Sequence, residues 1–79
     1  MARVTEFKHI EKERPQVHGV VECTCFTAEA RDGSRYLTFE TYGHPNRKHV
    51  GKANQCIQVD TVAAEKMIGV LQDFLDKKL

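Results

Sequence analysis

The sequence predicts an α+β fold, an antiparallel β-sheet of three to four strands with one C-terminal α-helix packed on one face. Three observations point to this class. Segments rich in β-branched and aromatic residues come first, a hairpin turn signal at Asp32-Gly33 joins two of them, and an amphipathic segment ends the chain. With 79 residues, the chain is expected to form one small domain, residues 1–79, with a thin core.

The N-terminal part predicts two extended segments. Residues 2–10 do not keep a strict alternation of apolar and polar side chains, so an edge strand or a partly ordered arm is expected. The charged run that ends at Pro15 predicts a loop, because proline donates no hydrogen bond and restricts the residue before it. Residues 17–30 predict a strand from their density of β-branched and aromatic side chains.

The turn signal predicts a β-hairpin. Asp32-Gly33 favours a type I′ turn, in which both central residues have a positive φ. The return strand is expected at residues 35–42. Alternation along it places Leu37 and Phe39 on one face and four residues on the other: Tyr36, Thr38, Glu40 and Tyr42.

The last third of the chain predicts a loop, a short strand and a helix. Residues 43–54 are rich in turn formers, and residues 55–60 form the expected strand. Asp60 or Thr61 can cap a helix that spans residues 61–79. One apolar stripe is expected to hold this helix on the sheet, at about 1.5–3 kcal/mol for each large side chain buried; it consists of Ala64, Met67, Ile68, Leu71, Phe74 and Leu75.

The charge distribution indicates a candidate binding site. No Asp or Glu occurs between Thr41 and Val59, and that stretch carries three cations. Cations on a loop can bind phosphate or carboxylate, and aromatic rings on an adjacent strand can stack on unpaired bases. The candidate nucleic-acid-binding residues are Arg35, Tyr36, Tyr42, Arg47, Lys48 and Lys52. The alternative interpretation is a solvated charged loop, with two tyrosines that cover the sheet.

The three cysteines indicate the redox compartment of the protein and raise the question of a metal site. An odd number excludes a complete internal disulfide framework, and reduced thiols in a cytoplasmic protein are expected. Cys23 and Cys25 share one face of the predicted strand, and Cys56 with His44 or His49 could complete four ligands. Zinc sites usually use C-x₂₋₄-C turns, so structural cysteines are the expected reading, with no metal and no cofactor.

Enzymatic and membrane functions are not expected. The four histidines are scattered, and no G-x-S-x-G, P-loop, H-E-x-x-H or paired-carboxylate pattern occurs. The apolar runs are far shorter than the ~18–20 residues that span a bilayer. The first residues mix charges throughout and lack the apolar segment of a signal peptide.

Residues 36–68 resemble two groups of proteins. The YGHPNRK segment, the Gly51-Lys52 pair and the QCIQ strand are similar to small bacterial and phage or mobile-element proteins with a Tyr-Gly-x-Pro-x-Arg-Lys loop and no established activity. A second resemblance rests on strand residues on both sides of the loop and on the Gly51-Lys52 pair; the strand residues are Leu37, Phe39, Tyr42, Ile57 and Val59. In these positions the chain more distantly resembles the positive-cofactor-four family of transcriptional coactivators. That resemblance implies a curved sheet, a C-terminal helix, a homodimer and single-stranded DNA on the sheet. Glu40 stands where that family tends to have arginine, and Ala64 where it has tryptophan.

The sequence thus predicts a small non-enzymatic binding module that forms a homodimer. Its expected ligand is single-stranded nucleic acid or another polyanion. The alternative is a phage or mobile-element protein that inhibits a host enzyme or defence complex by protein–protein contact. A net charge of +1 disfavours inhibition by nucleic-acid mimicry, which needs an acidic surface.

Overall fold

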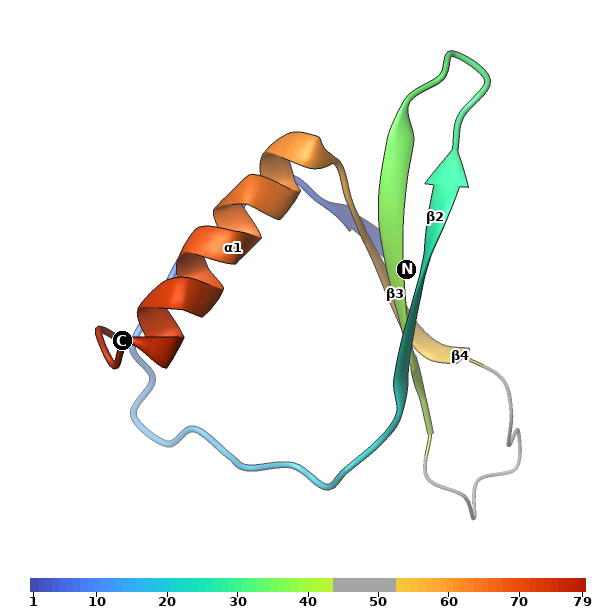
Figure 1. The fold of residues 1–79 in the computed structure, drawn as a ribbon. Helices are drawn as coiled ribbons and strands as arrows, with labels where there is room; N and C mark the ends of the chain where they lie inside the picture. Colours follow the sequence, from blue (N-terminus) through green and yellow to red (C-terminus); the bar gives the residue numbers. More distant parts are fainter. Residues whose placement is uncertain (44–52) are drawn as a thin grey trace.

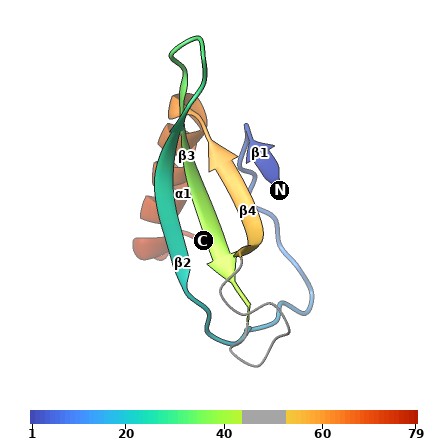
Figure 2. The ribbon, with the colours of Figure 1, turned by 90° about the vertical axis from the view of Figure 1, so that its right-hand side faces the viewer.

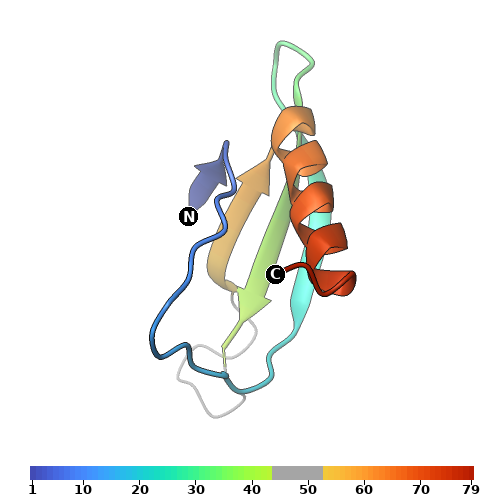
Figure 3. The ribbon, with the colours of Figure 1, turned by 90° about the vertical axis from the view of Figure 1, so that its left-hand side faces the viewer.

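The computed structural model describes residues 1–43 and 53–79, and it confirms the α+β class. Within these ranges the elements are β1 (Ala2–Val4), β2 (Cys23–Glu29), β3 (Arg35–Tyr42), β4 (Ala53–Val59) and α1 (Thr61–Leu75) (Figure 1). The strands form one sheet, and α1 lies against one side of it (Figures 2 and 3).

The strand order in the sheet is β1-β4-β3-β2. Strands β2, β3 and β4 pair antiparallel, as expected, whereas β1 pairs parallel to β4 at the opposite edge from β2. The sheet is therefore mixed rather than purely antiparallel. Alternation within a strand encodes which face each side chain occupies, but not the direction of its neighbour.

The hairpin forms where the sequence predicts it, but its turn is of a different type. The N–H of Gly33 donates to the carbonyl of Ala30 at 3.0 Å, and the N–H of Ala30 donates to the carbonyl of Ser34 at 2.8 Å. Gly33 has φ 90°, while Asp32 keeps a negative φ, so the type I′ prediction is wrong. The geometry fits a four-residue turn, 30–33, whose last residue is a left-handed glycine, the usual form of a three-residue hairpin loop.

Two strand boundaries also differ from the prediction. β2 begins at Cys23 rather than at residue 17, because its ladder with β3 ends at the Cys23–Thr41 pair and a single further bond from the N–H of Tyr42 to Glu22. In the part of the chain that the structure describes, residues 17–21 have no neighbouring strand to complete their backbone hydrogen bonds. β4 begins at Ala53, two residues before the predicted start, and an irregularity falls between Thr41 and Tyr42 of β3.

The helix begins as predicted and ends four residues early. A carboxylate oxygen of Asp60 accepts a hydrogen bond from the N–H of Ala63 at 2.8 Å, which makes Asp60 the N-cap. The helix ends at Leu75, and Lys77 adopts a left-handed φ of 59° that stops it. The backbone N–H groups of Lys77 and Lys78 close the end by bonding to carbonyls within the last turns.

The core is much smaller than the apolar stripe predicts. Among the described residues, the buried side chains are Val59 and Ala63, each at most 1% exposed, and Thr38. Four of the six stripe residues are exposed: Ile68, Leu71, Phe74 and Leu75. The prediction that the sheet of the same chain buries the whole stripe is therefore wrong. A single residue, Asp60, links α1 to β4, so the first turn of the helix contacts the sheet. Further along, the helix diverges from the sheet (Figure 1).

Candidate functional site

The face of the sheet turned away from α1 carries two of the predicted site residues. Strand pairing places Thr38 opposite Phe26 on one side and opposite Gln58 on the other. Tyr36 and Tyr42 share the parity of Thr38, so they lie on this same face. We call it the open face. Its described side chains are Arg3, Thr24, Phe26, Ala28, Tyr36, Thr38, Glu40, Tyr42, Cys56 and Gln58.

Three aromatic rings are distributed along the open face. Tyr36 and Tyr42 lie six residues apart on β3, which corresponds to about 20 Å of extended chain. Phe26 on β2 is paired with Thr38, so it lies between the two tyrosines along the strand direction, and its side chain is 48% exposed. Both tyrosines are half-buried. The face therefore offers separated flat rings to a ligand.

Arg3 reaches the open face from the edge strand β1. Its Nη1 donates a hydrogen bond to the Tyr36 hydroxyl at 3.2 Å, and its guanidinium carbon lies 5.1 Å from the centroid of the Tyr36 ring. This distance permits a cation–π interaction. Arg3 thus holds the ring of Tyr36 in place while its other N–H groups can still donate to a ligand.

Hydrogen bonds between side chains also order the rest of this face. The hydroxyls of Thr24 and Tyr42 are 3.0 Å apart and share a hydrogen bond across β2 and β3. The side-chain amide of Gln58 donates to the Thr38 hydroxyl at 3.1 Å, where Thr38 is almost fully buried. These bonds join neighbouring strands, and the first of them holds the hydroxyl of Tyr42 in place.

Glu40 places a negative charge on the same face. It is paired with Thr24 and with Cys56, between the levels of Phe26 and Tyr42. A carboxylate at this position repels phosphate, whereas the guanidinium of Arg3 attracts it. Among the described residues, the two side chains therefore have opposite effects on a phosphate bound to this face. A polyanion on this face would need further cations.

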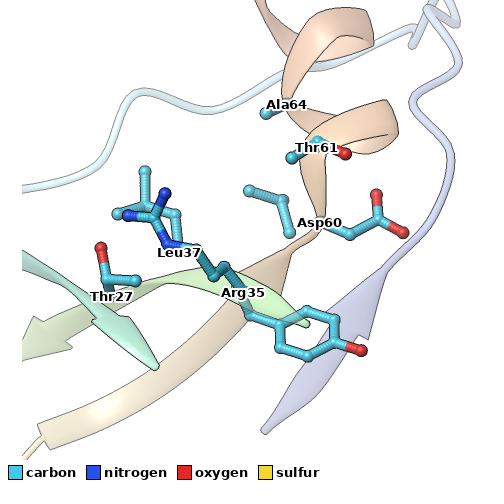
Figure 4. A pocket seen from close by; sticks show the side chains of 8 residues that line it. Thr27, Arg35, Leu37, Asp60, Thr61 and Ala64 are labelled. Atoms are coloured by element: carbon cyan, nitrogen blue, oxygen red, sulfur yellow. The ribbon is translucent and has the colours of Figure 1, made fainter. Parts of the chain in front are cut away.

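The other predicted cations are not on the open face of the described sheet. Arg35 has the parity of Leu37 and lies on the helix side, where it lines a hollow of about 230 Å³ with Thr27, Leu37 and Ala64 (Figure 4). Arg47, Lys48 and Lys52 lie outside the described residues. The structure thus brings Tyr36 and Tyr42 to one face and separates Arg35 from them.

The hollow in Figure 4 has little to offer a ligand. It lies where β4 meets the helix, and the carboxylate of Asp60 points toward the first turn, whose Ala63 N–H it already binds. Its lining includes neither cysteine nor histidine, so it contains no thiol or imidazole for nucleophilic catalysis.

Arg3 and Phe26 are members of the open face that the sequence did not reveal. Phe26 could have been found, because the hairpin pairs it with Thr38 and therefore places it beside the tyrosines. Arg3 had no such signal, because its position depends on the parallel pairing of β1 with β4.

The cysteines are divided between the two faces. Cys23 and Cys25 lie on the helix side, as their shared parity predicts, and Cys56 lies on the open face. No group of three or more His, Cys, Asp or Glu side chains in the described ranges is arranged to hold a metal ion. His44 and His49 fall outside those ranges.

Comparisons with other proteins add no family to this description. No family model, no curated protein and no solved structure matches the chain. The resemblances noted in the sequence therefore stay predictions. Across residues 1–43 and 53–79, no helix combines the length and apolar character needed to cross a bilayer.

Proposed function

We propose that the chain is a non-enzymatic binding module whose open face binds single-stranded nucleic acid, or another polyanion with flat groups. The observation that carries this proposal is the presence of Phe26, Tyr36 and Tyr42 on one face of the sheet, which α1 does not cover. Base–aromatic stacking contributes about 1–3 kcal/mol per base and tolerates any base sequence. Arg3 supplies one cation beside these rings.

The chain between Tyr42 and Ala53 is the proposed source of the remaining positive charge. It contains Arg47, Lys48 and Lys52 and no acidic residue, and it begins directly after Tyr42. Phosphate contacts release counterions, so binding should weaken steeply as salt rises. The proposal keeps these three cations in the site, together with Tyr36 and Tyr42, and adds Phe26 and Arg3.

The test is fluorescence anisotropy with a labelled oligo-dT of about 16 nucleotides, the upper end of single-strand site sizes for small sheet domains. Phe26→Ala and Tyr36→Ala should each weaken binding by about 5- to 150-fold, the equivalent of one lost stacking contact. Glu40→Gln should strengthen binding, because it removes a repulsive carboxylate from the same face.

A matched pair of arginines tests the choice of face. Arg3→Gln should weaken binding and reduce the salt slope by about 0.7, the value for one phosphate contact on a single strand. Arg35→Gln removes the same charge from the helix side and should leave affinity nearly unchanged. Equal losses in the two variants would contradict the open face as the site.

Failure to bind any oligonucleotide at low salt would refute the proposed function. A stoichiometric host enzyme or defence complex bound by the purified chain would then favour the alternative, an inhibitor that acts by protein–protein contact. Cytoplasmic location and homodimer formation also stay predictions from the sequence.

A further inference from the structure

One side of α1 carries a continuous apolar surface that nothing in the described chain covers. Ile68, Leu71, Phe74 and Leu75 are 66%, 52%, 65% and 69% exposed. Their spacing of three and four residues places them on one face of the helix. We call these four residues the helix stripe. Scattered exposed leucines are ordinary, but a contiguous patch of large side chains marks an interaction surface.

A shallow apolar hollow lies beside the helix stripe, on the helix side of the sheet. Its volume is about 300 Å³, and its apolar lining includes Phe39 of β3, Ile57 of β4 and Met67 of α1. Met67 lies four residues before Leu71 and seven before Phe74, so it shares their side of the helix. The stripe and the hollow therefore form one surface, a projecting helix face next to a recess.

The surface area of the chain shows how much is left uncovered. The accessible surface is 7218 Å², whereas a compact monomer of 9.0 kDa exposes about 4,900 Å². The radius of gyration is 14.9 Å, against about 11.6 Å for a compact domain of this length. The excess of roughly 2,300 Å² belongs to the whole chain, whose N-terminal segment is also exposed, and it is larger than the ~1,000 Å² per subunit at which obligate homodimer interfaces begin.

We propose that a second copy of the chain covers this surface, with the helix stripe of each copy packed into the hollow of the other. A two-fold dimer needs a self-complementary patch, and this chain carries both a projecting face and a recess on the same side. The net charge of +1 imposes little repulsion between copies. Such a dimer leaves both open faces free, so the proposal goes beyond the proposed binding function and does not depend on it.

The first test measures oligomeric state by sedimentation equilibrium on the full chain. We expect a mass of about 18 kDa, twice 9.0 kDa, and a melting temperature that rises with protein concentration. Leu71→Glu should weaken dimerisation by about 30-fold or more, as loss of an interface hot spot does. Val17→Glu is the control, because Val17 is fully exposed outside the surface and the change in charge is the same.

A second measurement maps the interface without any substitution, in case Leu71→Glu fails to fold. In a mixture of isotope-labelled and unlabelled chains, filtered NOEs should connect the Phe74 ring of one copy to Ile57 methyl protons of the other. A monomer at all concentrations would overturn the proposal, as would a dimer that Leu71→Glu leaves intact. NOEs from the stripe to Ile10 or Val17 of the same copy would show instead that the chain's own N-terminal segment covers it.

Discussion

Replacement of Asp60 by alanine tests how α1 is attached to the sheet. Asp60 is the single residue between β4 and α1, and its carboxylate accepts from the N–H of Ala63 at 2.8 Å. Ala63 is completely buried, and Val59, just before the link, is 1% exposed. The cap therefore lies between the two apolar side chains that form the described core, at the end of the helix that contacts the sheet.

The expected loss follows from the bond that is removed. Loss of an aspartate N-cap costs about 1 kcal/mol, within a range of about 0.5–2 kcal/mol. For a domain of this size, each kcal/mol lowers the melting temperature by about 4–8 °C. Since the whole free energy of unfolding of 79 residues is about 4–12 kcal/mol, this single change removes a measurable share of it.

The assay is thermal unfolding followed by circular dichroism at one fixed protein concentration. Asp60→Asn should keep most of the stability, because the amide oxygen still accepts from the helix N-terminus. Thr61→Ala should cost little, since the structure identifies Asp60 rather than Thr61 as the cap. If Asp60→Ala melts with the unchanged protein, or if Thr61→Ala is the more damaging variant, the reasoning about the cap is refuted.

Four further predictions concern the hairpin and the helix. Gly33→Ala should lower the free energy of unfolding by about 1 kcal/mol, because Gly33 has φ 90°. Gly69→Ala should raise it by about 0.5–1 kcal/mol, because a methyl group there meets nothing within 4 Å; urea unfolding of both variants would contradict this if the signs were reversed. The N–H of Ser34 donates a hydrogen bond to the carboxylate of Asp32 and lowers the pKa of that carboxyl group. The stability that this hydrogen bond contributes is therefore present above the ordinary pKa of aspartate, and it is lost as the pH falls through the lowered pKa. NMR titration of the Asp32 carboxyl carbon checks this, and a midpoint at or above the ordinary value would refute it. Ala63→Leu should cost about 1–3 kcal/mol by overpacking, and an unchanged urea midpoint would show that the helix does not pack tightly there.

The local elements could be predicted because their signals are local. The strand at Arg35–Tyr42 has the predicted boundaries, and the helix begins at the predicted Thr61. The type of turn could not be predicted, because Asp32-Gly33 fits both a two-residue turn and a longer loop with glycine in the left-handed position. The hydrogen bonds that Ala30 makes with Gly33 and with Ser34 decide between them.

The candidate site was only partly predictable for the same reason. Alternation along one strand places Tyr36 and Tyr42 together and Arg35 on the other side, although the charge pattern alone had grouped all three. Phe26 joins the tyrosines through pairing between β2 and β3. Arg3 joins them only because β1 pairs with a strand more than fifty residues later in the sequence.

Four features could be predicted from residues alone: the α+β class, the position of the hairpin, the cap region of the helix and the existence of an apolar helix stripe. Each of these follows from side-chain chemistry within a few neighbouring residues. The pairing of distant segments was needed to show that β1 runs parallel to β4, that Arg3 lies beside Tyr36, and that the stripe projects away from the sheet. Apolar periodicity shows that a surface favours burial, but the partner that buries it is set by the path of the whole chain and by the contacts available to it.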